Sequence, residues 1–395
     1  MAFARSVNTM GLSLVMSFLG IYVVETRGYP AWLYGVVCLI ANVGQSLSSA
    51  WAGNLSDRIG RRPLITNALF TRSAVIAILG TQVLLDAPLW SLAVNVIVSS
   101  TLRGCFEPVA YALVADIVTD EQRIPAFGLH RMSSNLGWAI GPALGGLLTL
   151  FMSYGAVFYV AAAAMIIAGF VTMNIADPIQ RTSDVVVETT DLKATLTEAL
   201  ADPLLRLLLV GSFLGALMTT QMFATFGIYL TTELGLAKAD VGWLYTINGV
   251  AVLVLQVPAI GLIERLGIGR VLPWSSLLSA IGFALIGAAT GFGGAAIAIL
   301  VLTTAEVMLD PAHQAAIAEC ADPTRRGRTY GVVSFAQMIG IALAPLTGGL
   351  LLDTIGDHHA TMWVMIATIG LAQTLCFVAF ARRRNSLLHP APVLG

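Results

Sequence analysis

Charge is the property that this 395-residue sequence has least of. Asp, Glu, Lys and Arg together make up 11% of the residues, whereas 57% are hydrophobic, and the mean hydropathy is +0.83. An ordinary soluble domain contains roughly a quarter charged residues. The composition therefore excludes an ordinary soluble domain and indicates a chain embedded in a lipid bilayer.

Two further absences narrow the chemistry. The four cysteines (Cys38, Cys105, Cys320 and Cys376) have neither metal-ligand spacing nor the arrangement of a disulfide framework, so we expect them to be packing residues. The sequence contains no phosphate-binding loop, so ATP is not the expected energy source. We expect no enzymatic activity, no cofactor, no metal site and no nucleic-acid partner.

Long apolar stretches fill the sequence instead. Runs of roughly 20 apolar residues can cross a bilayer as helices, and the chain contains about twelve of them. The predicted fold is therefore an all-α membrane protein with twelve transmembrane helices. The predicted centres of these spans are Leu14, Ile40, Val75, Val98, Ala139, Met165, Ala216, Val252, Ile281, Leu300, Ala342 and Ile369.

The positions of lysine and arginine predict the orientation. Most basic residues outside the spans fall on one side of the membrane in this layout, and only Arg27 and Lys238 fall on the other. Because basic loops stay in the cytoplasm, we expect both termini and the central loop to be cytoplasmic, in a plasma membrane or a prokaryotic inner membrane. The basic residues on that side are Arg58, Arg61, Arg62, Arg123, Arg181, Lys193, Arg265, Arg270, Arg325, Arg326, Arg328, Arg382, Arg383 and Arg384.

The chain repeats itself. Residues 107–146 align with residues 310–349 without a gap, at a constant offset of 203 positions, so that Glu107-Pro108 matches Asp310-Pro311. A repeat of this kind builds many transporters, in which the working site lies where the halves meet. We therefore expect two pseudo-symmetric bundles of six helices.

A polar segment separates the predicted bundles, which cover residues 1–177 and 204–395. The intervening residues 178–203 are predicted to be a cytoplasmic linker. After Asp191, leucines recur at helical spacing, which predicts a short amphipathic helix at the membrane surface.

The loop between spans two and three reads Gly53-Asn-Leu-Ser-Asp57-Arg58-Ile-Gly60-Arg61-Arg62. It resembles the signature loop of the major facilitator superfamily, G-x-L-x-D-R-x-G-R-R, at every fixed position. Gly60 permits a tight turn, and the basic cluster holds the loop at the headgroups. Asp57 among guanidinium groups could hold one conformation through switching ion pairs. Alternatively, these charges only anchor the topology.

The resemblance implies further members of a cytoplasmic gate. It implies that Asp57 and Arg61 form a network with an acid at the end of span four, a position that Asp116 occupies here. The second half keeps a partial copy of the loop, and Glu319 is the repeat mate of Asp116. The predicted gate residues are Gly53, Asp57, Arg58, Gly60, Arg61, Arg62, Asp116, Glu264, Arg265 and Glu319.

Span five contains Gly137-Trp-Ala-Ile-Gly141-Pro142-Ala-Leu-Gly145-Gly146. This segment resembles the antiporter motif of drug–proton exporters in the same superfamily, G-x-x-x-G-P-x-x-G-G. Glycines four residues apart make one smooth face on which another helix can pack closely, and the proline can bend the helix. The resemblance implies a helix that permits rocking between states, and simple helix packing is the alternative interpretation.

Ionisable residues within the spans are predicted to carry the chemistry, because charges are costly in lipid and normally face a cavity. Glu107 lies nine residues before the cytoplasmic end of span four, about 13 Å along a helix. Arg103 precedes it by four residues and is expected on the same helix face. In span ten, Asp310 and Glu306 repeat Glu107 and Arg103, and His313 follows within one turn.

These five residues admit structural readings as well. Three buried acids against one arginine favour a proton or a cation over an anion as the species handled. A structural ion pair, or Glu-Pro and Asp-Pro acting as helix bends, would serve no coupling role. His313 suits a pH switch, or it is satisfied and inert. Arg103 resembles the span-four arginine of drug exporters, but Phe106 and Glu107 replace the usual Gln and Gly that follow it, which weakens the transfer of a proton-relay role.

The sequence as a whole predicts a secondary active transporter that works by alternating access. The expected function is proton-coupled export of small amphipathic or hydrophobic compounds, of the multidrug efflux type, by a monomer. Its partners would be protons, a small-molecule substrate and the lipid bilayer. The alternatives are a lipid or metabolite carrier, with or without proton coupling, and a transport-inactive membrane receptor.

Overall fold

The structure, a computed structural model, describes residues 1–118, 123–175, 192–320, 326–355 and 359–388. The described residues form helices and no strands. Their contacts divide the chain into two compact units. Unit 1 comprises Met1–Val185, Met222–Gly249 and Pro345–Asp353, and unit 2 comprises Val186–Gln221, Val250–Ala344 and Thr354–Gly395. These units are defined by contacts between residues and not by the order of the helices. The predicted bundles, residues 1–177 and 204–395, therefore stay a prediction.

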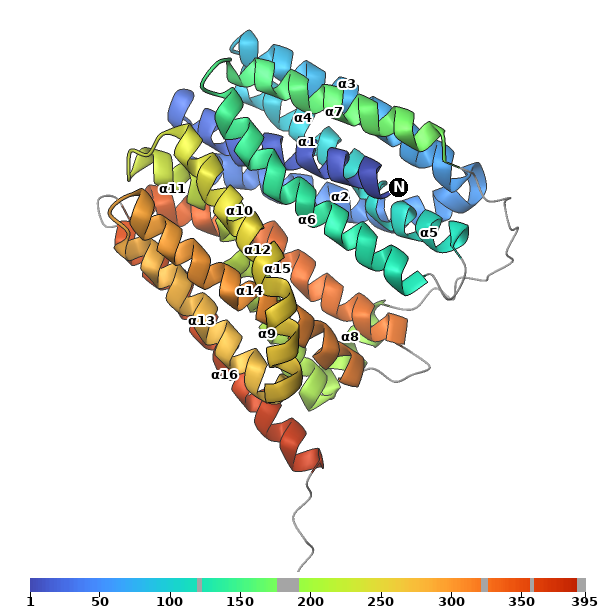
Figure 1. The fold of residues 1–395 in the computed structure, drawn as a ribbon, viewed down its shortest axis with the longest axis vertical. Helices are drawn as coiled ribbons and strands as arrows, with labels where there is room; N and C mark the ends of the chain where they lie inside the picture. Colours follow the sequence, from blue (N-terminus) through green and yellow to red (C-terminus); the bar gives the residue numbers. More distant parts are fainter. Residues whose placement is uncertain (119–122, 176–191, 321–325, 356–358, 389–395) are drawn as a thin grey trace, which may run out of the picture. The chain divides into compact units, whose positions relative to one another are not determined.

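The helices of the first half run in parallel rows in Figure 1, with α3 beside α7 and α1 beside α6. A π-helix, η1, extends α1. The bounds are α1 (Ala2–Ile21), η1 (Tyr22–Thr26), α2 (Ala31–Ile59), α3 (Arg61–Leu84), α4 (Leu89–Gly104), α5 (Glu107–Ile117), α6 (Arg123–Leu148) and α7 (Tyr154–Met173).

The second half begins with a short helix, α8, and then repeats the row of long helices. Here α13 packs beside both α14 and α16. The bounds are α8 (Leu192–Ala201), α9 (Pro203–Thr219), α10 (Gln221–Ala224), α11 (Phe226–Thr232), α12 (Lys238–Leu266), α13 (Ile268–Ala288), α14 (Phe292–Cys320), α15 (Arg326–Thr354) and α16 (His359–Leu388).

The predicted all-α membrane fold is confirmed. Eleven helical segments within the described residues are long and apolar enough to cross a membrane. The remaining predicted span, centred at Ala139, falls on α6, whose 26 residues extend about 39 Å at 1.5 Å per residue, more than the roughly 30 Å of a hydrocarbon core. Each unit has its own apolar core, with Phe106 and Leu113 in unit 1 and Leu208 and Phe377 in unit 2.

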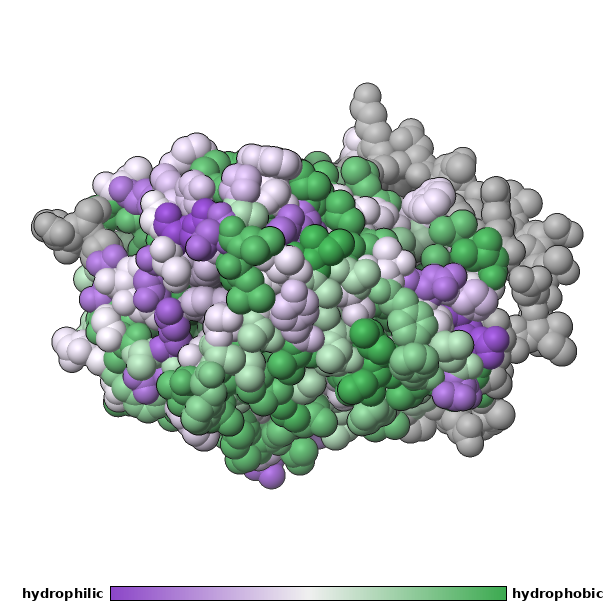
Figure 2. All heavy atoms as spheres, turned by 90° about the horizontal axis from the view of Figure 1, so that it is seen from above, coloured by the Kyte–Doolittle hydropathy of each residue, from purple (hydrophilic) through white to green (hydrophobic). Residues whose placement is uncertain are grey.

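Apolar side chains also cover much of the protein surface. Figure 2 shows broad hydrophobic areas on the face that it presents, with hydrophilic residues gathered in patches. Leu47, Val257 and Leu375 are among the large apolar residues that are more than two-thirds exposed. Exposed apolar area on this scale is unfavourable in water, and a surrounding bilayer removes that penalty.

The glycine motif of α6 forms a close contact with α1. A Cβ atom at Gly137 would lie 2.6 Å from the Ser6 carbonyl oxygen, and Gly141 and Gly145 are also too close to α1 for a side chain. Ser13 Oγ donates across the contact to the Gly137 carbonyl at 3.1 Å. The predicted smooth face is therefore present.

The same contact recurs in unit 2. Gly340, the repeat mate of Gly137, packs on α9, where a Cβ would lie 2.5 Å from the Phe213 carbonyl oxygen. Ala344, which replaces the repeat mate of Gly141, is completely buried. Gln221 fixes this helix pair by donating to the Ala344 carbonyl at 2.9 Å.

Span four is broken where span ten is continuous. α4 ends at Gly104, and α5 begins at Glu107 with Pro108 in its first turn. Pro108 has no N–H to donate to the Gly104 carbonyl, so the helical ladder is interrupted there. Instead, Phe106 donates to the Arg103 carbonyl at 2.9 Å. The repeat mate Pro311 lies inside the uninterrupted α14, so Glu-Pro forms a break and Asp-Pro does not.

The two signature loops make the same tight turn. Gly60 separates α2 from α3 with a φ of 93°, and Gly267 separates α12 from α13 with a φ of 77°. These positive angles are strained for residues with a Cβ. The turn predicted at Gly60 is confirmed, and the partial copy of the loop in the second half makes the same turn at Gly267.

Within unit 1, segments of the second half pack on the helices of the first at the end of the spans farthest from Met1. Gly146 of α6 meets Gly242 of α12, and Gly349 of α15 meets the backbone at Ala31 of α2. Asp353 at the end of α15 accepts hydrogen bonds from Ala31 N at 3.1 Å and Trp32 N at 2.7 Å. The carboxylate thus caps the start of α2, where the helix dipole favours a negative charge.

We expect Gly137→Ala to lower the melting temperature of the detergent-solubilised protein by several degrees, because the added methyl group collides with backbone atoms of α1. Gly261→Ala on α12 is the matched control, since nothing lies within 4 Å of its Cβ position. Equal melting temperatures for the two variants would contradict the close contact.

We expect Asp353→Asn to open the contact between α15 and α2 more often, because the start of α2 loses a charged acceptor. A cysteine at Ala31, which is 2% exposed, reports the opening in a chain whose native cysteines are replaced. Its labelling by a membrane-impermeant maleimide should accelerate about tenfold. Asp240→Asn is the control, because Asp240 caps its own helix at Ala237. Equal labelling in both variants would contradict the capping role.

Candidate functional site

Glu107 forms a partly buried ion pair with a residue far away in the sequence. Its Oε2 lies 2.7 Å from Arg5 Nη1, and the two side chains are 32% and 6% exposed. Arg5 projects from the second turn of α1, whereas Glu107 begins α5 directly after the break in span four. The break thus presents the carboxylate to α1, with one side still accessible.

Arg5 is held by two aromatic side chains as well. It donates to His130 Nε2, so the proton of a neutral His130 lies on Nδ1. That Nδ1 is buried and has no hydrogen-bond partner among the described residues. The guanidinium carbon lies 5.0 Å from the centre of the Tyr111 ring, which packs edge-on against His130. Arg5 therefore has two contacts besides Glu107 that hold its orientation.

Two more arginines lie close by, and their hydrogen bonds go to neutral groups. Arg72 of α3 donates to Asn8 Oδ1 at 3.1 Å and to Ser99 Oγ at 3.4 Å. Arg103, in the last turn of α4, donates to Gln45 Oε1 at 3.5 Å. Both arginines are near enough to Glu107 to interact with it electrostatically. We call Arg5, Arg72, Arg103 and Glu107 the arginine cluster.

The arginine cluster adds two residues to the charges that the sequence singled out. Glu107 forms its ion pair with Arg5, and the expectation that Arg103 and Glu107 share a helix face stays a prediction. With Arg5 and Arg72 included, the expected balance of three acids against one arginine becomes three acids against three arginines. Arg72 could have been found, since it is a charge in the middle of an apolar span. Arg5 was missed because it lies so near the N-terminus.

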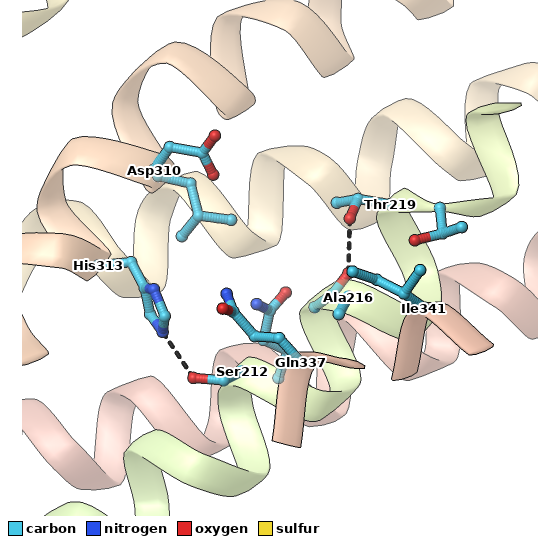
Figure 3. A pocket seen from close by; sticks show the side chains of 11 residues that line it. Ser212, Ala216, Thr219, Asp310, His313, Gln337 and Ile341 are labelled. Atoms are coloured by element: carbon cyan, nitrogen blue, oxygen red, sulfur yellow. Dashed lines mark hydrogen bonds between the residues drawn. The ribbon is translucent and has the colours of Figure 1, made fainter. Parts of the chain in front are cut away.

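Unit 2 contains a cavity of ≈ 210 Å³ between α9, α14, α15 and α16, lined by both polar and apolar residues (Figure 3). Asp310 and His313 project from α14, as predicted, and lie on the same wall of this cavity. Five further polar side chains line it, and the sequence did not single them out. They are Ser212, Thr219, Thr220, Gln337 and Gln373.

His313 is buried, and a hydrogen bond to a serine determines which ring nitrogen of the neutral side chain carries the proton. Ser212 Oγ donates to the Leu208 carbonyl at 2.6 Å, so it accepts from His313 Nε2, also at 2.6 Å. The ring packs against Phe377. A neutral His313 therefore carries its proton on Nε2 and keeps Nδ1 as an acceptor. Glu306 lies one turn before Asp310 on α14, and both acids are exposed.

The predicted gate is only partly within the description. The structure does not describe the side chains of Asp57, Arg58 and Asp116 or the surroundings of Gly53. Arg61 and Arg62 begin α3, and Arg62 donates to the carbonyl of Ile175 at 3.1 Å, just beyond the end of α7. A cation suits this position because the dipole of a helix is negative at its C-terminus.

The second copy of the predicted gate lies at the ends of α12 and α14. Glu264 and Arg265 end α12, and both are exposed. Glu319 makes a two-point ion pair with Arg384 of α16, at 2.6 and 2.9 Å. This pair ties α14 to α16 within unit 2. The gating roles of all these residues stay predictions.

Sequence comparisons place the chain among membrane transporters. A model of the Major Facilitator Superfamily matches residues 1–231 and 208–392. The multidrug resistance protein MdtH of Aeromonas salmonicida (strain A449) is 26% identical over 392 residues, 96% of this chain and 94% of that protein. The uncharacterized MFS-type transporter YqjV of Bacillus subtilis (strain 168) is 24% identical over 385 residues, 96% of this chain and 92% of that protein.

Solved structures share the fold at lower sequence identity. A mutant of the nucleoside transporter NupG superposes with a TM-score of 0.74 at 14% identity, over 95% of this chain and 98% of that one. A bacterial homologue of the human lysosomal transporter Spinster, inward-facing and occupied, gives the same TM-score and identity over 99% and 97%. These likenesses establish the fold alone.

We expect the ion pair in the arginine cluster to appear as energetic coupling. Arg5→Met and Glu107→Gln should each lower the melting temperature by several degrees, since each leaves a buried partner unpaired. The double variant should lose clearly less than the two effects combined. Arg5→Met with Glu233→Gln, an exposed acid at the end of α11, is the control and should be additive. Additivity in both pairs would show that Arg5 and Glu107 do not interact.

Proposed function

Because the chain belongs to the major facilitator superfamily, we propose that it is a proton-coupled exporter of small amphipathic or hydrophobic compounds, working by alternating access. The multidrug resistance protein MdtH is similar over nearly the whole chain, which supports efflux as the direction. The observation that carries the proposal is the ion pair between Arg5 and Glu107, a titratable carboxylate held inside the apolar bundle of unit 1.

The pair can act as a proton-controlled connection between helices. While Glu107 is ionised, its attraction to Arg5 holds the start of α5 on α1. Protonation removes the negative charge and weakens this connection, and it lowers the cost of enclosing the carboxyl in a closed cavity. His130 and Tyr111 keep Arg5 in place meanwhile. Proton loading from outside and release inside would then drive the substrate in the opposite direction.

Two contact regions would serve as the gates of this cycle. The signature loop, with Asp57, Arg58, Arg61 and Asp116, is the proposed cytoplasmic latch. The contact of Asp353 with the start of α2 is the proposed outer one. This assignment follows the basic-residue distribution, which predicts cytoplasmic termini in a bacterial inner membrane.

An uncoupled metabolite carrier is the second candidate, and one observation favours it. Arg72 and Arg103 hydrogen-bond only to neutral partners among the described residues. Two cations without dedicated counter-ions would suit a substrate that brings a negative charge of its own. Such a carrier would transport an anionic metabolite with or without a proton.

Flux measurements in proteoliposomes test the proposal. We expect a pH gradient to drive accumulation of ethidium, a fluorescent amphipathic cation, and Glu107→Gln to reduce this accumulation at least tenfold. Without a gradient, the variant should still exchange substrate across the membrane, because only coupling is lost. Glu233→Gln is the matched control and should behave as the unmodified protein.

Three results would overturn the proposal. They are ethidium flux that ignores the gradient, full gradient-driven flux in Glu107→Gln, and gradient-insensitive transport of an organic anion instead of ethidium. The last of these would favour the metabolite carrier.

A further inference from the structure

We propose that the cavity in unit 2 is a subsite for a protonated amine on the substrate, a site separate from the arginine cluster of unit 1. This inference rests on one part of the proposed function, namely that the protein transports a small molecule. The inference names a chemical group that this molecule would carry and the residues that would bind that group.

The wall of the cavity includes hydrogen-bond acceptors that could receive a cationic donor. Asp310 supplies a carboxylate, which accepts from several donors at once. His313 has its Nε2 proton committed to Ser212, so its Nδ1 has a lone pair and no proton. A carboxylate beside neutral acceptors attracts a cationic donor and repels an anion. An ammonium group, with a positive charge and up to three N–H donors, matches this lining.

Gln373 adds an unused acceptor. This side chain of α16 lines the cavity, is 3% exposed, and its Oε1 has no hydrogen-bond partner among the described residues. A buried polar atom without a partner is costly, and a ligand donor would remove that cost. Gly215 of α9 makes room for Gln373, because a Cβ there would collide with the amide nitrogen.

The size of the cavity points to a head group. Whole drug-sized ligands occupy pockets of roughly 300–1,000 Å³, and this cavity measures ≈ 210 Å³. A bare metal cation would leave most of it empty, since one water takes about 30 Å³. Leu309 and Ile341 form apolar parts of the wall, which suits the carbon atoms next to the amine. Ile341 is labelled in Figure 3.

Calorimetry on the purified full-length protein in detergent tests the subsite with three probes of similar apolar bulk: 2-phenylethylamine, 2-phenylethanol and 3-phenylpropanoate. We expect the amine to bind at least tenfold more tightly than the alcohol or the carboxylate, because only the amine pairs with Asp310. Asp310→Asn should cost about tenfold or more in amine affinity, and Asp310→Glu should restore most of it. Gly215→Ala should weaken the amine several-fold by displacing Gln373.

The affinity of a variant is interpreted only if its melting temperature shows that the protein is folded. Glu233→Gln is the control. Equal affinity for the three probes would overturn the inference, as would an Asp310→Asn protein that is folded and binds the amine normally. No gradient enters this measurement. A failure of proton-driven flux therefore leaves the subsite standing, and a failure of amine binding leaves the flux result standing.

Discussion

The cost of holding charge inside an apolar bundle governs this structure. Arg5, Arg72 and Arg103 would each be expensive in hydrocarbon, and each is hydrogen-bonded to a side chain from another helix. These bonds connect α1 with α6, α3 with α1, and α4 with α2. The requirement to satisfy buried guanidinium groups therefore organises unit 1 around Glu107, the one carboxylate that pairs with an arginine of the cluster among the described residues.

The two halves have kept one framework and changed its chemistry. Gly137 and Gly340 make equivalent helix contacts, and Gly60 and Gly267 make equivalent turns. At the repeated acid the halves differ. Glu107 starts a new helix beside arginines, whereas Asp310 lies within a continuous helix beside a neutral histidine. The repeat thus contains two acids at matching positions, and the residues around them differ.

The sequence predicted what depends on local pattern. Apolar runs located the spans, and glycine spacing located the close face of α6. Contacts between distant segments were harder: Arg5 meets Glu107 across about a hundred residues, and no local pattern encodes such a pair. The sequence left open whether Glu-Pro bends its span, because the effect of a proline depends on what packs beside it. At Gly104 the neighbour is α2, whose Ser48 and Gln45 approach so closely that a side chain cannot fit.

The contact between α15 and α2 has a mechanical consequence. Gly349 meets the backbone at Ala31, and Gly35 meets the backbone at Pro345, so peptide groups face each other without interlocking side chains. Two such surfaces can separate and reseat without any rotamer change. The barrier to parting them would then come mainly from the Asp353 hydrogen bonds, so a single side chain could set the speed of this step independently of its geometry.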